Sequence, residues 1–416
     1  MSAPDRISNL PDDLLLCIMF FLTLKEAVQT CLLSRRWKNV WASLMWLNFD
    51  AAKFSSMKAF QKFVDNLLLY RKSLPVPVPL DAFWISAVCN NSDDSLDYSD
   101  IHPWIQHALD SNAWALGILK HCGPRPLSIE GYPFPFTSVH LKILGLCHFS
   151  VDDSFVKNLA SYCPVLDDLE LTSCAINVTM FSSTSLKSLA ITSTNTARDF
   201  PKEFQHLVIC MPNLVSLRLE EIPRRNIHLM DVSSLETASI YLFSLSFEHS
   251  NIDCNILSSL SNATRLELVS VSVFEDVVPK VLQRDLPRCG TFRKLKQLHL
   301  GEWFLIGGCY PLIYLLQSSP NIEKVILQLN GSGADDYDNH TSFPNADAEI
   351  DPPHEETLST FSCEKLRKIK IYCRHYDKRA QIIVRILSSF LSPLPEIKIK
   401  HIWDKDVVVV GDITMD

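Results

Sequence analysis

One short apolar pattern recurs along most of this 416-residue chain, and it constrains the fold more than any other feature. The pattern is an apolar residue, two further residues, an apolar residue, one further residue and an apolar residue. With 47% apolar residues, chance supplies a match at about one position in ten, so a single copy carries no information. The spacing is informative, because the twelve copies recur with a mean step of about 28.5 residues. They start at Leu80, Ala113, Leu141, Leu166, Leu186, Leu214, Leu235, Ala263, Leu295, Ile322, Leu366 and Leu394.

Helical segments and prolines separate several of these copies. Pro164, Pro212 and Pro320 come just before a copy, where each ends the preceding helical segment. The step lies in the range of leucine-rich repeats, and Cys174 occupies the asparagine-or-cysteine position of its unit. We therefore predict an α/β fold: an irregular leucine-rich-repeat solenoid with a parallel sheet on the concave face and helices on the convex face. The steps vary from 20 to 44 residues, so an ordinary α/β domain is the alternative.

The first fifty residues have a different, helical pattern. Pro11 followed by two aspartates predicts a helix start, and Thr23 with Glu26 forms a capping-box pattern for a second helix. Ser34 can cap a third helix, which carries Trp37 and Trp41. Three short helices cannot bury their many leucines and tryptophans among themselves, so this segment is expected to need a partner surface.

The segments Arg6–Leu15 and Thr30–Trp37, together with Trp41, resemble an F-box of the plant type. The resemblance implies docking on a Skp-type adaptor, and through it on the cullin and RING subunits of a ubiquitin ligase. The alternative is a three-helix cap on the repeats. Carried over position by position, the adaptor-binding residues would be Leu10, Pro11, Leu14, Leu15, Ile18, Leu33 and Trp37.

Two further segments support this resemblance. A helical face at residues 60–68 and a proline-rich step at residues 75–79 resemble the bridge of plant F-box proteins with leucine-rich repeats, which implies rigid attachment. The run from Cys363 to Ile399 is similar to the FBD region of such proteins, although Ser388-Ser389-Phe390 replaces the usual asparagine–alanine pair. It includes a strand with one basic face at 366–372, and we expect the region to cap the open sheet edge.

These patterns predict five parts of the chain. They are an F-box at 1–50, a helical and extended bridge with the first irregular repeats at 51–112, leucine-rich repeats at 113–330, an acidic loop at 331–357 and an FBD-like C-terminal cap at 358–416.

The charge of the chain is uneven. Its net charge is −8, and residues 331–357 hold eight carboxylates without Lys or Arg, so the remainder balances at 39 against 39. This balance argues against nucleic-acid binding. The Asp335–Asp338 cluster lacks the spacing of a calcium loop, so we expect a solvated loop and no metal or cofactor.

Cysteine spacing and hydropathy indicate the compartment. The thirteen cysteines include no CxxC motif, the first residues lack a signal-peptide pattern, and the longest apolar run has nine residues. We therefore expect free thiols, no membrane span and a location in the nucleus or cytoplasm.

No catalytic motif stands out, and the F-box resemblance implies a non-catalytic receptor subunit that recruits a target protein for ubiquitination. The alternative is a leucine-rich-repeat binding scaffold with no ligase role. The exposed strand positions of the better repeats are candidates for target binding, with a solvated strand face as the alternative. They are Asp168, Glu170, Thr172, Ser216, Arg218, Glu220, Gln297 and His299.

Overall fold

The computed structural model forms two compact units, Met1–Thr196 (unit 1) and Ala197–Asp416 (unit 2), each described here by itself. The residues that the structure describes are 7, 10–34, 36–87, 96–120, 126–192, 205–220, 225–242, 256–270, 286–329, 360–374 and 377–401. The acidic segment 331–357 and its Asp335–Asp338 cluster lie outside the described residues.

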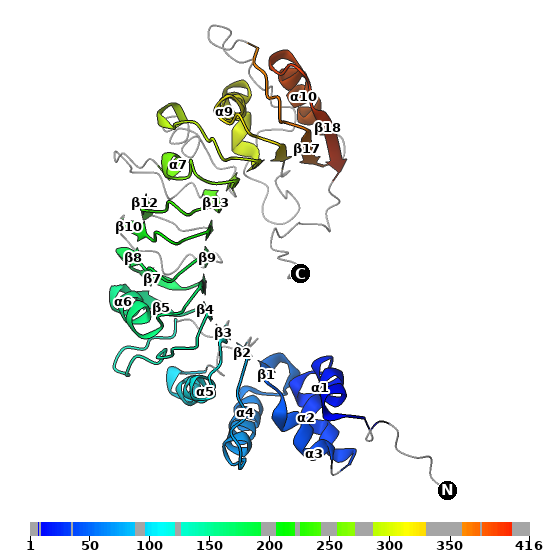
Figure 1. Ribbon diagram of the computed structural model, residues 1–416, viewed down its shortest axis with the longest axis vertical. Helices are drawn as coiled ribbons and strands as arrows, with labels where there is room; N and C mark the ends of the chain where they lie inside the picture. Colours follow the sequence, from blue (N-terminus) through cyan, green and yellow to red (C-terminus); the bar gives the residue numbers. More distant parts are fainter. Residues whose placement is uncertain are drawn as a thin grey trace, which may run out of the picture. The chain divides into compact units, whose positions relative to one another are not determined.

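Unit 1 begins with the predicted short helices (Figure 1). The predicted capping box is confirmed, because Thr23 N donates to Glu26 Oε2 at 2.9 Å and Glu26 N donates to Thr23 Oγ1 at 3.3 Å. Asp12 and Asp13 lie in the first turn of the first helix, where the helix dipole favours negative charge. The elements are α1 (Asp12–Phe20), α2 (Leu24–Gln29), η1 (Thr30–Leu32), α3 (Trp37–Val40), η2 (Trp41–Ser43), η3 (Ala51–Lys53), α4 (Met57–Lys72), α5 (Tyr98–Asp110) and α6 (Asp153–Tyr162).

The main sheet of unit 1 is parallel, with the strand order β1-β2-β3-β4-β6-β9. These strands are β1 (Trp46–Asp50), β2 (Ala82–Ala87), β3 (Ala115–Lys120), β4 (Ile143–Cys147), β6 (Asp168–Thr172) and β9 (Ser188–Thr192). Three shorter strands follow the main ones: β5 (Ser150–Asp152), β7 (Ala175–Asn177) and β8 (Met180–Ser182). The sheet begins at Trp46, earlier than the repeat pattern predicts, so β1 lies inside the segment expected to be only F-box.

The hydrogen bonds of Cys174 explain why its repeat carries a cysteine there. Its Sγ lies 3.4 Å from the carbonyl oxygen of Leu146 and accepts from the N–H of Phe149 at 3.5 Å. The thiol thus contacts backbone polar groups of the preceding repeat. Burial raises the pKa of this thiol to about 12.

Unit 2 continues the alternation of strands and helices. Its main sheet is also parallel and has the order β11-β13-β14-β15-β16-β17-β18. These strands are β11 (Ser216–Glu220), β13 (Thr237–Leu242), β14 (Arg265–Ser270), β15 (Gln297–Leu300), β16 (Lys324–Gln328), β17 (Lys368–Cys373) and β18 (Glu396–His401). A second pair is formed by β10 (Gln205–Cys210) and β12 (Arg225–Met230).

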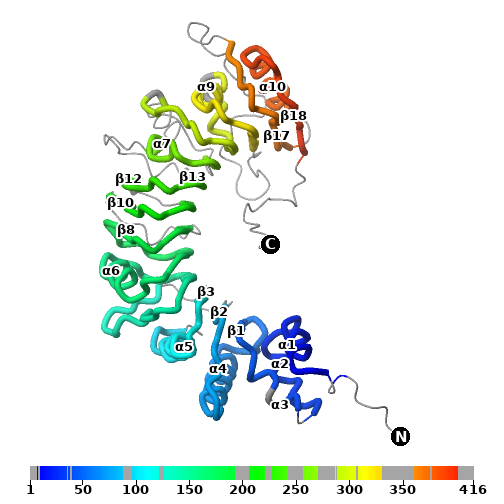
Figure 2. Tube along the Cα trace, viewed as in Figure 1, coloured from blue at the N-terminus to red at the C-terminus, as the bar shows by residue number. Residues whose placement is uncertain are grey.

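The helical elements of unit 2 are α7 (Ile256–Ser259), η5 (Leu286–Arg288), η6 (Glu302–Leu305), α9 (Ile306–Gln317) and α10 (Lys378–Phe390). Helices α9 and α10 lie close together beside the strands (Figure 2). Arg379 of α10 donates to Glu302 of η6 at 3.2 Å and to Asp377 at 2.7 Å. Burial raises the pKa of Glu302 to about 7, although Arg379 opposes this shift.

The FBD-like region, which we expect to cap the open sheet edge, contributes strands to that sheet, and its capping role stays a prediction. This region adds β17 and β18 to the same parallel sheet, with α10 between them in the chain, as further repeat units would. In the part of the chain that the structure describes, β18 is the last strand of this sheet, and its side chains are mostly exposed. The described fold is thus mixed α/β with N-terminal helices and a large parallel sheet, and the solenoid remains a prediction.

Candidate functional site

Two surfaces carry the residues that the sequence singles out: the N-terminal helices and the exposed side of the sheet. On the N-terminal helices, Leu14 and Ile18 are 49% and 39% exposed, and Leu33 is 67% exposed. Leu14, Ile18 and Phe21 follow an i, i+4, i+7 spacing that places them on one face of α1 and at its end. We call the exposed apolar side chains Leu14, Ile18, Phe21, Leu32 and Leu33 the F-box surface.

Two of the seven predicted adaptor-binding residues are buried in this structure, and the adaptor-binding set as a whole stays a prediction. Leu15 is fully buried and Trp37 is 2% exposed, so both pack in the core of the N-terminal helices and do not face a partner in this structure. Leu10 is half-buried and Pro11 is exposed. The i, i+4 spacing alone did not separate Leu14 from Leu15, because adjacent residues on a short amphipathic helix can both lie near the edge of its apolar face.

A buried arginine that sequence reasoning missed holds these helices to the bridge. Arg71 of α4 donates from Nη1 to the carbonyl oxygens of Ala42 at 2.6 Å and Leu44 at 2.8 Å. Its Nη2 donates to the carbonyl oxygen of Val78 at 3.4 Å, in the proline-rich step. Burial lowers the pKa of Arg71 to about 10. One guanidinium thus connects the end of η2, helix α4 and the proline-rich step, which agrees with the expected rigid attachment.

The exposed side of the unit 1 sheet is largely apolar at its first strands. The Trp84 indole lies over Gly117 and Gly145, and a Cβ added at Gly117 would overlap Cε3 and Cζ3 of that ring. In the register, Trp84 is the partner of Gly117 and Gly117 is the partner of Gly145. The predicted polar positions begin only at β6, where Glu170 is exposed and Asp168 and Thr172 are half-buried.

In unit 2 the exposed side of the sheet carries a hydrogen-bonded polar network. Glu267 of β14 lies at its centre: Ser239 Oγ donates to Oε2 at 2.7 Å, and His299 Nδ1 lies 2.7 Å from Oε1. The other ring nitrogen of His299 lies 3.0 Å from Gln328 Oε1. Burial alone would raise the pKa of Glu267, but the His299 and Ser239 hydrogen bonds and nearby Arg218 lower it overall.

Five of the predicted target-binding residues lie on strands of this sheet. Arg218 pairs with Glu220 at 2.6 Å, and His299 joins the network around Glu267. Ser216 and Gln297 are half-buried at the first positions of β11 and β15, where the register places them opposite Thr237 and Arg265. Whether any of the eight residues binds a target stays a prediction.

Sequence reasoning missed Ser239, Tyr241, Glu267 and Gln328, whose positions become informative only through the register of β13 to β16. The arrangement does not form a nucleophile–base pair, because the Ser239 hydroxyl donates to the Glu267 carboxylate and not to the His299 imidazole. Tyr241 OH lies 3.5 Å from Glu267 Oε1, and burial together with Glu267 raises its pKa.

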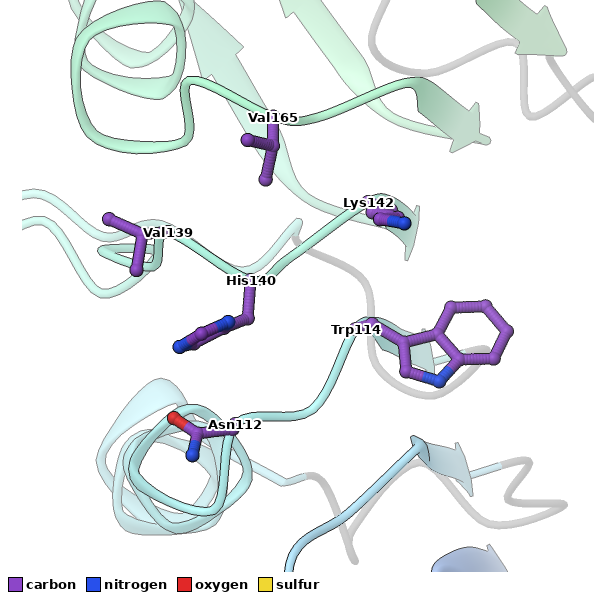
Figure 3. A pocket seen from close by; sticks show the side chains of 6 residues that line it. All are labelled: Asn112, Trp114, Val139, His140, Lys142 and Val165. Atoms are coloured by element: carbon purple, nitrogen blue, oxygen red, sulfur yellow. The ribbon is translucent and has the colours of Figure 1, made fainter.

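A shallow depression of about 450 Å³ lies where β3, β4 and β6 begin. It is lined by Asn112, Trp114, Val139, His140, Lys142 and Val165 (Figure 3). Asn112 and His140 lie near one another, and Trp114 projects away from them. Val139 is largely exposed, so the depression is open to solvent and offers no enclosed ligand site. Among the described residues, no cluster of three or more potential metal ligands occurs, and no helix is long and apolar enough to cross a membrane.

Comparisons with known proteins show which proteins this chain is similar to. A family model, the F-box domain, matches residues 7–48. F-box/FBD/LRR-repeat protein At5g22660 of Arabidopsis thaliana is 26% identical and covers 94% of both chains. F-box/LRR-repeat protein At3g03360 of the same plant is 25% identical over 84% of this chain and 74% of its own. The putative FBD-associated F-box protein At5g56820 is 30% identical over 41% of this chain and 42% of its own. The resemblance inferred from the sequence is therefore confirmed.

Proposed function

We propose that this chain is the substrate-recognition subunit of an SCF-type ubiquitin ligase. It carries an F-box, and it is similar along its length to plant F-box proteins with leucine-rich repeats and an FBD region. The F-box binds a Skp-type adaptor, and the adaptor connects it to the cullin and RING subunits. The exposed side of the sheet, in a leucine-rich-repeat solenoid, binds the target protein. The chain itself performs no chemistry, and it works in the nucleus or cytoplasm.

The observation that carries this proposal is the match of residues 7–48 to the F-box, together with the exposed F-box surface. Large apolar side chains in water are unfavourable, so Leu14, Ile18 and Leu33 gain free energy when a partner covers them. The ligase then acts by proximity, because holding the target beside a charged ubiquitin-conjugating enzyme raises the effective concentration of its lysines. Arg71 supports this role, since a rigid connection keeps the distance between F-box and sheet within unit 1 constant.

The test is co-purification of the full chain with a Skp-type adaptor. The triple variant Leu14→Ala, Ile18→Ala, Leu33→Ala should weaken adaptor binding by at least about 100-fold, since each central apolar contact contributes about 1–2 kcal/mol. The matched control is Leu69→Ala with Val76→Ala, which removes comparably exposed apolar side chains outside residues 7–48. Unchanged adaptor binding by the triple variant would reject the assigned surface. If the wild-type chain binds no Skp-type adaptor, the better interpretation is the alternative, a leucine-rich-repeat binding scaffold with no ligase role.

A further inference from the structure

Five lysines lie on the exposed side of the last three strands of unit 2, and we call them the lysine face: Lys324 on β16, Lys368 and Lys370 on β17, and Lys398 and Lys400 on β18. On β16 and β17 these lysines alternate with the buried residues Val325, Ile369 and Ile371, so they share the side of the sheet that faces away from the core. The sequence shows the basic side of β17 alone, and only the register joins it to lysines from the two neighbouring strands.

The register places like charges beside one another. Lys324 is the partner of Lys368, and Lys370 is the partner of Lys398. Neighbouring strands lie about 4.8 Å apart, and like charges directly opposite one another are destabilising. Folding therefore brings these ammonium groups together against their mutual repulsion.

The described residues compensate only part of this charge. On the exposed side of the described strands β16 to β18, Glu396 is the one carboxylate, and it lies 2.9 Å from Lys398 and 3.8 Å from Lys368. Lys400 Nζ lies 5.9 Å from the centre of the Tyr372 ring. Within the described part of the chain, neither Lys324 nor Lys370 forms an ion pair with a carboxylate.

The pKa of Lys324 reflects the same excess of positive charge. Partial burial lowers it, and nearby Lys370, Arg265 and Lys368 lower it further. The described strands β16 to β18 thus concentrate positive charge on one side of the sheet. A bound anion would remove the repulsion and satisfy the ammonium donors.

We propose that the lysine face binds an extended acidic segment of a protein, which it contacts through carboxylates laid across β16, β17 and β18. That this protein is a ubiquitination target rests on the function proposed above. Lysine ammonium groups are compact point charges that suit separate carboxylates. Ile326, half-buried between Lys324 and Gln328, offers an apolar contact within the same surface.

A protein segment fits this surface better than a nucleic acid does. The exposed side of β16 to β18 carries no arginine, and Tyr372 is its one aromatic side chain. Single-stranded nucleic acids are usually held by several stacking aromatic residues in a basic groove. The net charge of −8 also repels a long polyanion more strongly than it repels a short acidic peptide.

The experiment measures the fluorescence anisotropy of a labelled ten-residue peptide of alternating Glu and Ser with the full chain in complex with its Skp-type adaptor. The same peptide with Gln in place of Glu, and a ten-nucleotide oligothymidine, serve as comparison probes. Lys370→Glu with Lys398→Glu is the test variant, and Lys370→Gln with Lys398→Gln is a milder second variant. The matched control is Lys58→Glu with Lys62→Glu on exposed positions of α4, which changes the net charge by the same amount.

We expect the wild-type chain to bind the Glu peptide at least tenfold more tightly than the Gln peptide at 50 mM salt, and less tightly at 300 mM salt. The affinity for the Glu peptide should fall at least tenfold in the test variant and severalfold in the Gln variant. In the control it should fall less than twofold. Equal binding of the Glu and Gln peptides, an equal loss in the control, or tighter binding of oligothymidine would each overturn the proposal. Adaptor binding is measured in the same samples. Loss of adaptor binding would contradict the proposed function, whereas loss of peptide binding alone would contradict the proposal for the lysine face.

Discussion

The contact between Trp84 and Gly117 offers the sharpest test of the packing on the unit 1 sheet. The indole lies over Gly117, and a Cβ there would overlap two ring atoms and lie 2.8 Å from a third, Cδ2. Gly117→Ala therefore forces the ring away from the sheet. If about 100 Å² of apolar surface is lost from this contact, the cost at 25 cal/mol per Å² is about 2.5 kcal/mol.

For a unit of this size, about 2.5 kcal/mol corresponds to a fall in Tm of roughly 5–10 °C. The assay is thermal unfolding followed by circular dichroism, with Gly290→Ala as the control, since a Cβ there meets no atom within 4 Å. Gly145→Ala should lower the Tm less than Gly117→Ala, because the nearest atom of Trp84 would lie 3.4 Å from the new Cβ.

A double-mutant cycle separates the overlap from other effects of an alanine in a strand. In a Trp84→Ala background the ring is absent, so Gly117→Ala should be close to neutral or slightly stabilising through the lower entropy of the unfolded chain. The coupling between the two positions should then reach about 2 kcal/mol. A Gly117→Ala variant as stable as the wild type, or one equally destabilised with and without Trp84, would refute the reasoning.

Three further predictions follow from buried polar groups. Arg71→Leu should lower the free energy of unfolding by about 3 kcal/mol, because it leaves the buried carbonyl of Ala42 without its donor. Urea unfolding measures this change, and Lys72→Leu at the exposed neighbouring position is the control. The folded-state pKa of Glu302, about 7, lies above its value in the unfolded chain, so its stabilising contribution is complete below about pH 4.5 and is lost as the pH rises through 7. Glu302→Gln should remove a decrease of about 3 kcal/mol between pH 4 and pH 8, and an unchanged pH dependence would contradict this assignment. Burial raises the pKa of Cys174 to about 12, so iodoacetamide at pH 8 should modify exposed Cys17 while Cys174 reacts only after unfolding, as peptide mass spectrometry would show.

Sequence reasoning located most of the helices and strands because their signals are local. The capping box at Thr23 depends on one side chain three residues away, and the repeat spacing depends on residues within one unit. The same reasoning placed the first strand too late, since Trp46–Asp50 precedes the first copy of the pattern. It assigned the FBD-like region a capping role, and only the strand pairing shows that β17 and β18 of this region belong to the sheet.

The sequence alone determined which residue types alternate along each strand and where each N-terminal helix begins, because both depend on neighbours a few positions away. Only the tertiary structure decided that Leu15 and Trp37 face inward while Leu14 and Leu33 remain exposed. It also decided that Glu267 meets His299, and that Lys370 stands beside Lys398. These contacts join residues about 30 positions apart in the chain, and they depend on strand register, which is set when the apolar sides of neighbouring strands pack together.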